Sequence, residues 1–184
     1  MELIKNIKEI SFLKSLFLVI FATILLAISA KIKIPFYPVP MTMQTFVVLL
    51  IGIIFGWKLG LFTISLYLIE GLVGLPVFAG TPEKGMGLVY FVGPTMGYLI
   101  GFVAAVFLAG YFKYNKNYIL NFFKLILSVS LIYIFGMIWL VNFTGWDKVF
   151  IVGAQPFLLA ELFKIALLTI LIPKILKYRS NKPI

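Results

Sequence analysis

Residues 42–72 read TMQTFVVLLIGIIFGWKLGLFTISLYLIEGL, and this stretch decides the fold class. It consists of two apolar runs separated at Gly56-Trp57-Lys58, a segment just long enough for a turn. The hydrocarbon core of a bilayer is about 30 Å thick, and an apolar helix of roughly 20 residues crosses it. The stretch therefore predicts two short membrane helices joined by a tight turn.

The whole chain has the composition of a membrane protein. Its 184 residues are 62% hydrophobic and 12% charged, whereas soluble domains carry about 45–50% apolar and about 25% charged residues. A soluble domain of this length could not bury the excess apolar surface, so a lipid bilayer must surround it. We expect an all-α integral membrane protein that forms a single domain over residues 1–184.

Six transmembrane helices account for most of the chain. They are predicted at residues 15–30, 42–55, 59–72, 95–112, 125–143 and 156–172. Proline and glycine break regular structure, so segments 34–43 and 71–94 are predicted to be irregular, as is the loop 142–155. The last helix is expected to end near Pro173. The apolar run that follows Lys14 is interpreted as a membrane helix because it is long for a cleaved signal peptide.

Lysine and arginine are distributed unevenly between the two ends of these helices. Eleven lie near the termini or after the second and fourth helices, four lie in the other connections, and Lys164 lies within the last helix. Cytoplasmic connections are enriched in these residues, so both termini are predicted to be cytoplasmic. The same rule explains the net charge of +10 without nucleic acid as a partner. The outer connections are long and irregular, which predicts a substrate pocket that opens to the outside.

Missing residue types exclude several kinds of chemistry. The chain contains neither cysteine nor histidine, which excludes disulfides, thiol nucleophiles, imidazole proton relays and the usual zinc and haem ligands. We therefore predict neither a metal site nor a cofactor. No Gly-Lys-Ser or Gly-Lys-Thr sequence is present, so any ATP hydrolysis must come from a partner.

Glu161 and Lys164 are the strongest candidates for a binding site. They are three residues apart in the last predicted helix and therefore share one face of it. A charge at the middle of a membrane helix costs about 2.5–3.5 kcal/mol, so such residues usually face the protein interior and serve function. The alternatives are an internal salt bridge without a ligand, or a lysine that extends to the membrane surface. Gln44 is a second polar candidate, although contact with lipid headgroups at a helix start is the favoured explanation when Gln44 is considered alone.

Four segments of the chain resemble the BioY family, the biotin-specific S components of energy-coupling-factor (ECF) transporters. They are PVPMTMQTF at 38–46, GLPVFAG at 74–80, GPTMGYLIGF at 93–102 and PFLLAELFKIAL at 156–167. Their order and spacing also match, as does the length of the chain. The resemblance implies biotin uptake through a multi-pass protein of the bacterial cytoplasmic (inner) membrane, and no enzymatic activity. It also implies an energising module made of a transmembrane T subunit and two ATPases.

The resemblance assigns substrate-binding positions to particular residues. Biotin contacts are implied for Gln44, Tyr98, Trp139, Glu161 and Lys164. This chain departs from the usual family pattern at three places. The family usually has aspartate where Glu161 stands, further glycines in the segment after Ala79-Gly80, and in some members an arginine where Leu99 stands. The cation that pairs with the biotin carboxylate is therefore either Lys164 or Lys84.

A stripe of residues on the first predicted helix is a candidate docking surface. Ala22, Leu26 and Ala30 are spaced by four, so they lie close to one line along the helix. Small residues let membrane helices approach closely, and the stripe resembles the family's contact with the energising module. Internal packing and contact with lipid are the alternative interpretations.

Two other functions are compatible with the residues. One is an S component for another vitamin. The other is a small intramembrane enzyme that uses Glu161 as its acid and base.

Overall fold

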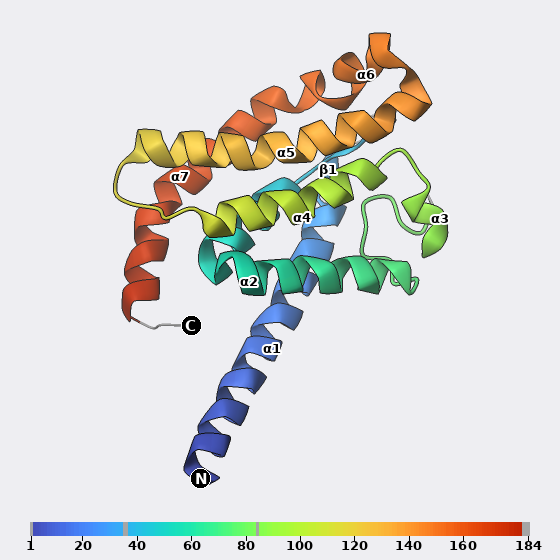
Figure 1. The fold of residues 1–184 in the computed structure, drawn as a ribbon. Coiled ribbons are helices and arrows are strands. Elements are labelled where there is room, and N and C mark those ends of the chain that lie inside the picture. Colours follow the sequence, from blue (N-terminus) through green and yellow to red (C-terminus); the bar gives the residue numbers. More distant parts are fainter. Residues whose placement is uncertain (1, 35–36, 84, 182–184) are drawn as a thin grey trace.

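A computed structural model describes the backbone of residues 2–34, 37–83 and 85–181, with side chains for 13–33, 37–83 and 85–177. Apart from one pair of two-residue strands, the regular secondary structure of the described residues is helical (Figure 1). The helices are α1 (Glu2–Lys31), α2 (Gln44–Leu72), α3 (Leu88–Phe91), α4 (Met96–Tyr111), α5 (Tyr118–Thr144), α6 (Trp146–Gly153) and α7 (Leu158–Asn181). The strands β1 (Lys33–Ile34) and β2 (Met41–Thr42) pair antiparallel, and a 3-10 turn (Gln155–Phe157) precedes α7.

Four helical stretches in the described part of the chain are long and apolar enough to cross a membrane. They are Leu13–Lys31, Gln44–Leu72, Tyr118–Thr144 and Trp146–Lys177. Helix α4 is equally apolar in character but has only 16 residues. The prediction of an all-α membrane protein is confirmed at this level.

Helix α2 contains the break that the sequence predicts. Gly56 has φ 73° and ψ 176°, a conformation that is not helical and that only glycine adopts readily. The two predicted helices 42–55 and 59–72 are the two arms of α2 on either side of this residue. Figure 1 shows the chain changing direction there, at the left end of α2.

Three predicted boundaries were wrong because apolar content does not mark where helical hydrogen bonding stops. Helix α1 begins at Glu2 and not at residue 15, and α5 begins at Tyr118 and not at 125. Lysine, glutamate and leucine are good helix formers, so the helices continue beyond their apolar parts. Helix α7 likewise continues past Pro173 to Asn181. A proline removes one amide donor, a loss that membrane helices tolerate when neighbouring groups satisfy the freed carbonyl.

The segment 142–155 was also predicted incorrectly as a loop. It contains the end of α5 and the eight residues of α6. Gly145 separates these helices with φ 74° and ψ 166°. The apolar residues Val149 and Val152 pack α6 back onto the core, which explains why this short stretch is ordered as a helix.

Helix α4 lies between α2 and α5, and glycines set the close approach on both sides. A Cβ atom added at Gly52 of α2 would lie 2.9 Å from the Ala109 Cβ of α4. One added at Gly101 of α4 would lie 2.6 Å from the Ile132 Cα of α5. Small residues at such crossings allow the backbone contact that holds membrane helices together.

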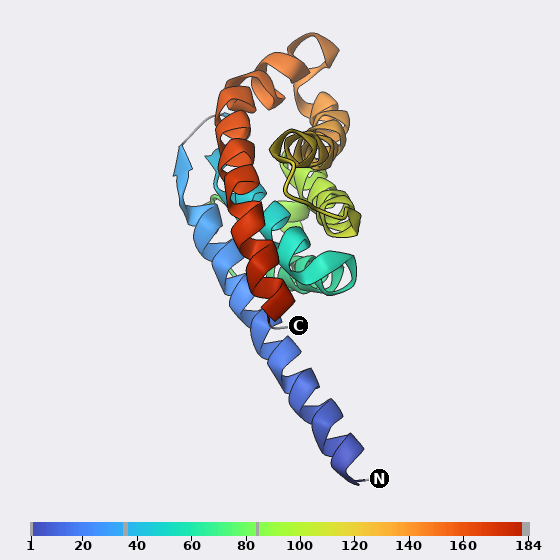
Figure 2. The same cartoon turned by 90° about the vertical axis from the view of Figure 1, so that its left-hand side faces the viewer.

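The stripe on α1 faces the protein interior. Ala22, Leu26 and Ala30 are 3%, 0% and 0% exposed, and Ala22 and Leu26 belong to the hydrophobic core. The stripe is therefore buried in this structure, which favours internal packing, and docking of a partner on it stays a prediction. The exposed face of α1 carries larger residues, including Phe17 and Phe21. Figure 2 shows the N-terminal part of α1 projecting away from the other helices.

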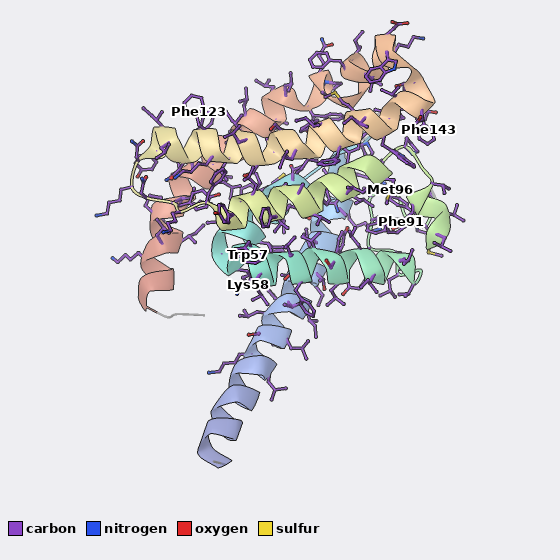
Figure 3. All side chains as sticks on the ribbon, viewed as in Figure 1. Trp57, Lys58, Phe91, Met96, Phe123 and Phe143 are labelled. Atoms are coloured by element: carbon purple, nitrogen blue, oxygen red, sulfur yellow. The ribbon has the colours of Figure 1, made fainter. Side chains whose placement is uncertain are left out.

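The connections differ between the two ends of the helical layer. One end carries the corner at Gly56 and the short connection 112–117, and the other carries α3, α6 and the long connections (Figure 1). Figure 3 shows Trp57 and Lys58 at the first end, with Phe91, Met96 and Phe143 at the second. We call these the short-connection end and the long-connection end.

Candidate functional site

A small cavity lies between the long connections and helices α2, α4, α5 and α7. Its volume is about 60 Å³. Most of its lining is apolar or aromatic, with a few polar side chains, which is the usual character of a small-molecule site. The lining residues are Val39, Pro40, Met41, Thr42, Gln44, Thr45, Ala79, Tyr90, Thr95, Tyr98, Leu99, Phe102, Ile132, Tyr133, Phe157 and Glu161.

The predicted pair of charges in α7 is present as a buried salt bridge. Lys164 Nζ lies 2.8 Å from Glu161 Oε1, and each residue is 5% exposed. Lys164 Nζ also donates to the Thr42 carbonyl oxygen at 2.6 Å and to Thr45 Oγ1 at 3.0 Å. A lysine ammonium has three N–H groups, so the protein itself satisfies all three.

The two carboxylate oxygens of Glu161 differ in their hydrogen bonding. Its Oε1 accepts from Lys164 and, at 2.8 Å, from the Thr45 hydroxyl. Its Oε2 is buried and has no hydrogen-bond partner, the only such side-chain atom among the described residues. A buried carboxylate oxygen without a donor is unfavourable, so this atom is suited to accept a hydrogen bond from a ligand.

Lys164 lies on the opposite side of the pair from the cavity. It does not line the cavity but borders an apolar groove of about 600 Å³. Met41 and Thr42 line both spaces. The network of Thr42, Thr45, Glu161 and Lys164 therefore separates the cavity from the groove.

Gln44 lines the cavity and is held by a residue that sequence analysis did not identify. Its Nε2 donates to the Tyr67 hydroxyl at 2.7 Å, and that hydroxyl donates to the Val77 carbonyl oxygen at 2.8 Å. Tyr67 is fully buried. Nothing in the sequence distinguishes Tyr67 from the other tyrosines, because its partners Gln44 and Val77 lie 23 and 10 residues away in the chain.

The two predicted aromatic residues occupy different places. Tyr98 lines the cavity, and its hydroxyl donates to the Gly153 carbonyl oxygen at 2.7 Å. Trp139 does not line the cavity, and its Nε1 donates to the Gly93 carbonyl oxygen at 2.9 Å. The structure thus brings together Gln44, Tyr98 and Glu161, while a direct substrate contact by Trp139 or Lys164 stays a prediction.

The lining contains no lysine or arginine among the described residues. Leu99 occupies part of the wall with an apolar side chain. Lys84, the other candidate for pairing with a ligand carboxylate, lies outside the described residues. The described part of the chain also shows no cluster of acidic residues that could hold a metal ion.

One segment of the long-connection end is held in place by side chains from other elements. Residues 77–81 connect α2 to α3, and Ala79 among them lines the cavity. The Tyr90 hydroxyl donates to the Ala79 carbonyl oxygen at 2.8 Å. Burial raises the pKa of Tyr90, so the hydroxyl keeps the proton that this bond needs. Lys31 Nζ donates to the carbonyl oxygens of Phe78 and Thr81.

Fold and site together define a helical membrane protein with a small buried cavity that is lined by Glu161, whose Oε2 has no hydrogen-bond partner. The chain belongs to the BioY family, whose family model matches residues 4–181.

Known relatives and a solved structure are similar over most of the chain. A probable biotin transporter BioY of Pyrococcus horikoshii is 37% identical over 153 residues, which are 83% of this chain and 90% of that protein. The biotin transporter BioY of Thermotoga maritima is 34% identical over 163 residues, 87% of this chain and 94% of that protein. A crystal structure described as the S-component for biotin from an ECF-type ABC transporter has a TM-score of 0.78 and 25% identity. The match covers 91% of this chain and 93% of that one.

Proposed function

We propose that this protein binds biotin in the cavity beside Glu161 and serves as the substrate-binding component of a biotin uptake system. The family membership and the similarity to biotin transporters support biotin as the ligand. The single observation that carries the assignment to this cavity is the buried, unpartnered Oε2 of Glu161.

The chemistry of biotin fits the lining. Its ureido ring offers two N–H donors and a carbonyl acceptor. In this proposal Glu161 Oε2 accepts a hydrogen bond from one ureido N–H. The side-chain amide of Gln44 forms a hydrogen bond with the polar edge of the ureido ring. The apolar rings of Tyr98, Phe102 and Phe157 suit the thiophane ring and the aliphatic chain. Lys164 does not contact the ligand in this arrangement, and its salt bridge orients the Glu161 carboxylate.

Biotin requires the lining to move apart. The cavity of about 60 Å³ is small beside the roughly 300–1,000 Å³ of pockets that take larger ligands. Binding of biotin therefore involves movement of the side chains that line the cavity.

The direct test is calorimetric titration of the purified protein in detergent with biotin, and separately with thiamine and riboflavin. Biotin alone should bind. Glu161→Gln should weaken biotin binding by roughly tenfold to a hundredfold, because it removes a charge-assisted hydrogen bond. Glu161→Asp should keep affinity within about tenfold. Glu70→Gln, a carboxylate change in α2 outside the lining, is the matched control and should bind like the parent.

A folded protein that fails to bind biotin would refute the proposal, and selective binding of another vitamin would replace the ligand. The named relatives are transporters, which argues against an enzyme that uses Glu161 as acid and base.

We further propose that residues 1–184 form one membrane domain with six transmembrane segments and cytoplasmic termini. The arms of α2 supply two of these segments, and the eleven-to-four distribution of cations supports the orientation. The chain contains no native cysteine, so single-cysteine variants at Lys84 and Lys116 can be labelled without background. An impermeant maleimide added to intact cells should label position 84 and spare position 116. The reverse pattern would overturn the orientation.

The partner is proposed to be an ECF energising module, made of a transmembrane subunit and two ATPases. The absence of a Gly-Lys-Ser or Gly-Lys-Thr sequence supports an external source of ATP hydrolysis. Affinity purification from cells that express such a module should recover all three subunits. Recovery of this chain alone, with undiminished biotin uptake, would contradict the proposal.

A further inference from the structure

The segment Val77–Thr81 has no helix or strand of its own, so side chains from three helices fix its position. Tyr67 of α2 donates to the Val77 carbonyl oxygen, and Tyr90 of α3 donates to the Ala79 carbonyl oxygen, both at 2.8 Å. The Phe78 ring is buried and lies against the rings of these two tyrosines, with centroids 5.3 Å and 4.8 Å away. Those contacts anchor the segment from inside the protein.

Lys31 holds the same segment from the outside. Its Nζ donates to the Thr81 carbonyl oxygen at 2.9 Å, to Thr81 Oγ1 at 3.1 Å and to the Phe78 carbonyl oxygen at 3.2 Å. These bonds use all three N–H groups of the ammonium. They join the last residue of α1 to residues 47 and 50 positions further along the chain.

The residue between these bonds faces the cavity. Ala79 lines the cavity, and the residues that flank Ala79-Gly80 in the chain, Phe78 and Thr81, carry the oxygen atoms that Lys31 binds. The Lys31 side chain is solvent-exposed, unlike Tyr67 and Tyr90. Its bonds can therefore be exchanged for water without exposing apolar surface, and they are the contacts of the segment that open most easily.

We propose that Lys31 is a positioning residue that holds Phe78–Thr81 against the cavity and thereby sets how slowly the bound ligand leaves. This inference rests on the proposed function, because the ligand is taken to be biotin in the Glu161 cavity. The cavity is too small for biotin to pass without displacement of its lining. When the Lys31 bonds break, the wall that contains Ala79 is released. Lys31 does not line the cavity, so its effect should fall on the rates at which the ligand leaves and enters.

The test compares Lys31→Met with Lys33→Met. Lys33 is also exposed, lies two residues away, and shows no hydrogen bond to Phe78–Thr81 in the described structure. Release of radiolabelled biotin is followed after a chase with unlabelled biotin, and association is measured separately. Lys31→Met should raise the dissociation rate about tenfold, since three bonds to a charged group are lost. It should not slow association, because the ligand enters past the same wall. Lys33→Met should change neither rate.

Hydrogen exchange of the ligand-free proteins gives a second measurement. The amides of residues 78–81 should exchange faster in Lys31→Met and not in Lys33→Met. If Lys31→Met does not fold, Thr81→Val removes one of the three acceptors, together with the hydrogen bond from the Thr81 hydroxyl to the Phe78 carbonyl oxygen, and should raise the dissociation rate at least threefold.

The outcomes separate this inference from the proposed function. If the parent binds biotin and Lys31→Met releases it at the parental rate, the role of Lys31 is refuted and the function stands. A loss of affinity that arises from slower association would also refute it, because that result indicates a damaged site. If the parent does not bind biotin, the function fails, and the exchange measurement alone decides whether Lys31 holds the segment.

Discussion

The two ends of the helical layer are held together by different kinds of hydrogen bond. At the short-connection end the partners are near neighbours in sequence. Asn121 Nδ2 donates to the Asn115 carbonyl oxygen six residues away, and the Tyr114 hydroxyl donates to the Ala109 carbonyl oxygen five residues away. Lys124 reaches back eleven residues to the carbonyl oxygen of Lys113. The connection between α4 and α5 can therefore form from these two helices alone.

At the long-connection end the partners come from distant parts of the chain. Thr45 and Glu161 are 116 residues apart, and Lys164 and the Thr42 carbonyl are 122 residues apart. Tyr98 and Gly153 are separated by 55 residues. Such bonds exist only when all the helices have packed. The short-connection end therefore serves as a scaffold, and the long-connection end contains the site. Substitutions at the short-connection end should change stability alone.

The largest effect is expected from removing one partner of the buried salt bridge. Lys164→Met leaves the Glu161 carboxylate buried without its cation, which should cost about 3–5 kcal/mol in unfolding free energy. It should also weaken biotin binding about tenfold or more, because Glu161 loses its orientation. Unfolding in mixed detergent micelles and biotin titration on the same sample measure both quantities.

The double variant Glu161→Gln with Lys164→Met tests the cause. It should recover much of the stability, because no uncompensated charge remains, while biotin binding stays weak. Unchanged affinity in folded Lys164→Met would show that the pair is structural and that ligand binding lies elsewhere.

A large effect of a different kind is expected at the short-connection end. A Cβ atom at Gly110 would overlap the backbone nitrogen of Trp57, so Gly110→Ala should force α2 and α4 apart at a cost of about 1–3 kcal/mol. The biotin affinity of the folded fraction should not change. Ala166→Val is the control, because Ala166 lines an open groove with room for added methyl groups. A marked loss of affinity in Gly110→Ala would contradict the separation of the two ends.

A moderate effect that combines both quantities is expected at Tyr98. Tyr98→Phe removes the hydrogen bond to the Gly153 carbonyl oxygen and should cost about 0.5–1.5 kcal/mol in stability. Because Tyr98 also lines the cavity, biotin affinity should fall by up to about tenfold. Tyr114→Phe removes a comparable hydroxyl bond at the other end and should leave affinity unchanged. Equal affinities in the two variants would contradict the contrast.

The smallest effect is expected from the start of α5. The Asn117 side chain accepts from the Leu120 amide at 3.0 Å and caps the helix. Asn117→Ala should lower the unfolding free energy by about 0.5–1 kcal/mol, and Asn117→Ser should restore it, since serine also caps helices. Biotin binding should be the same in all three proteins. Any change in biotin affinity would show that this connection communicates with the site.

The same contrast explains what sequence analysis could predict. The α-helical membrane fold, the break at Gly56 and the shared face of Glu161 and Lys164 depend on residues close together in the chain, and these predictions were confirmed. Local spacing also predicted the stripe of Ala22, Leu26 and Ala30. It could not decide whether that stripe faces a partner or the core, because the answer depends on where α2 lies.

The hydrogen-bond partners within the site could not be predicted for the same reason. Thr45, Tyr67 and Lys31 have no local pattern that distinguishes them from other polar residues in the chain. Their roles follow from groups that are 116, 10 and 47 or 50 residues away. The resemblance to a family located Gln44, Tyr98 and Glu161 at the cavity, but it gave no indication that the N–H groups of Lys164 are all bound within the protein.

The corner in α2 connects the two ends mechanically. Gln44 lies on one arm and Tyr67 on the other, and the bond between them closes the angle whose vertex is Gly56. The arm from Gly56 to Tyr67 is about 16 Å long at 1.5 Å per residue. A rotation of about 10° at Gly56 would therefore displace Tyr67 by roughly 3 Å. The distance between Gln44 Nε2 and the Tyr67 hydroxyl would then be too long for a hydrogen bond. The Gln44–Tyr67 bond therefore restrains the angle between the two arms of α2, since the two residues lie at the far ends of arms that meet at Gly56.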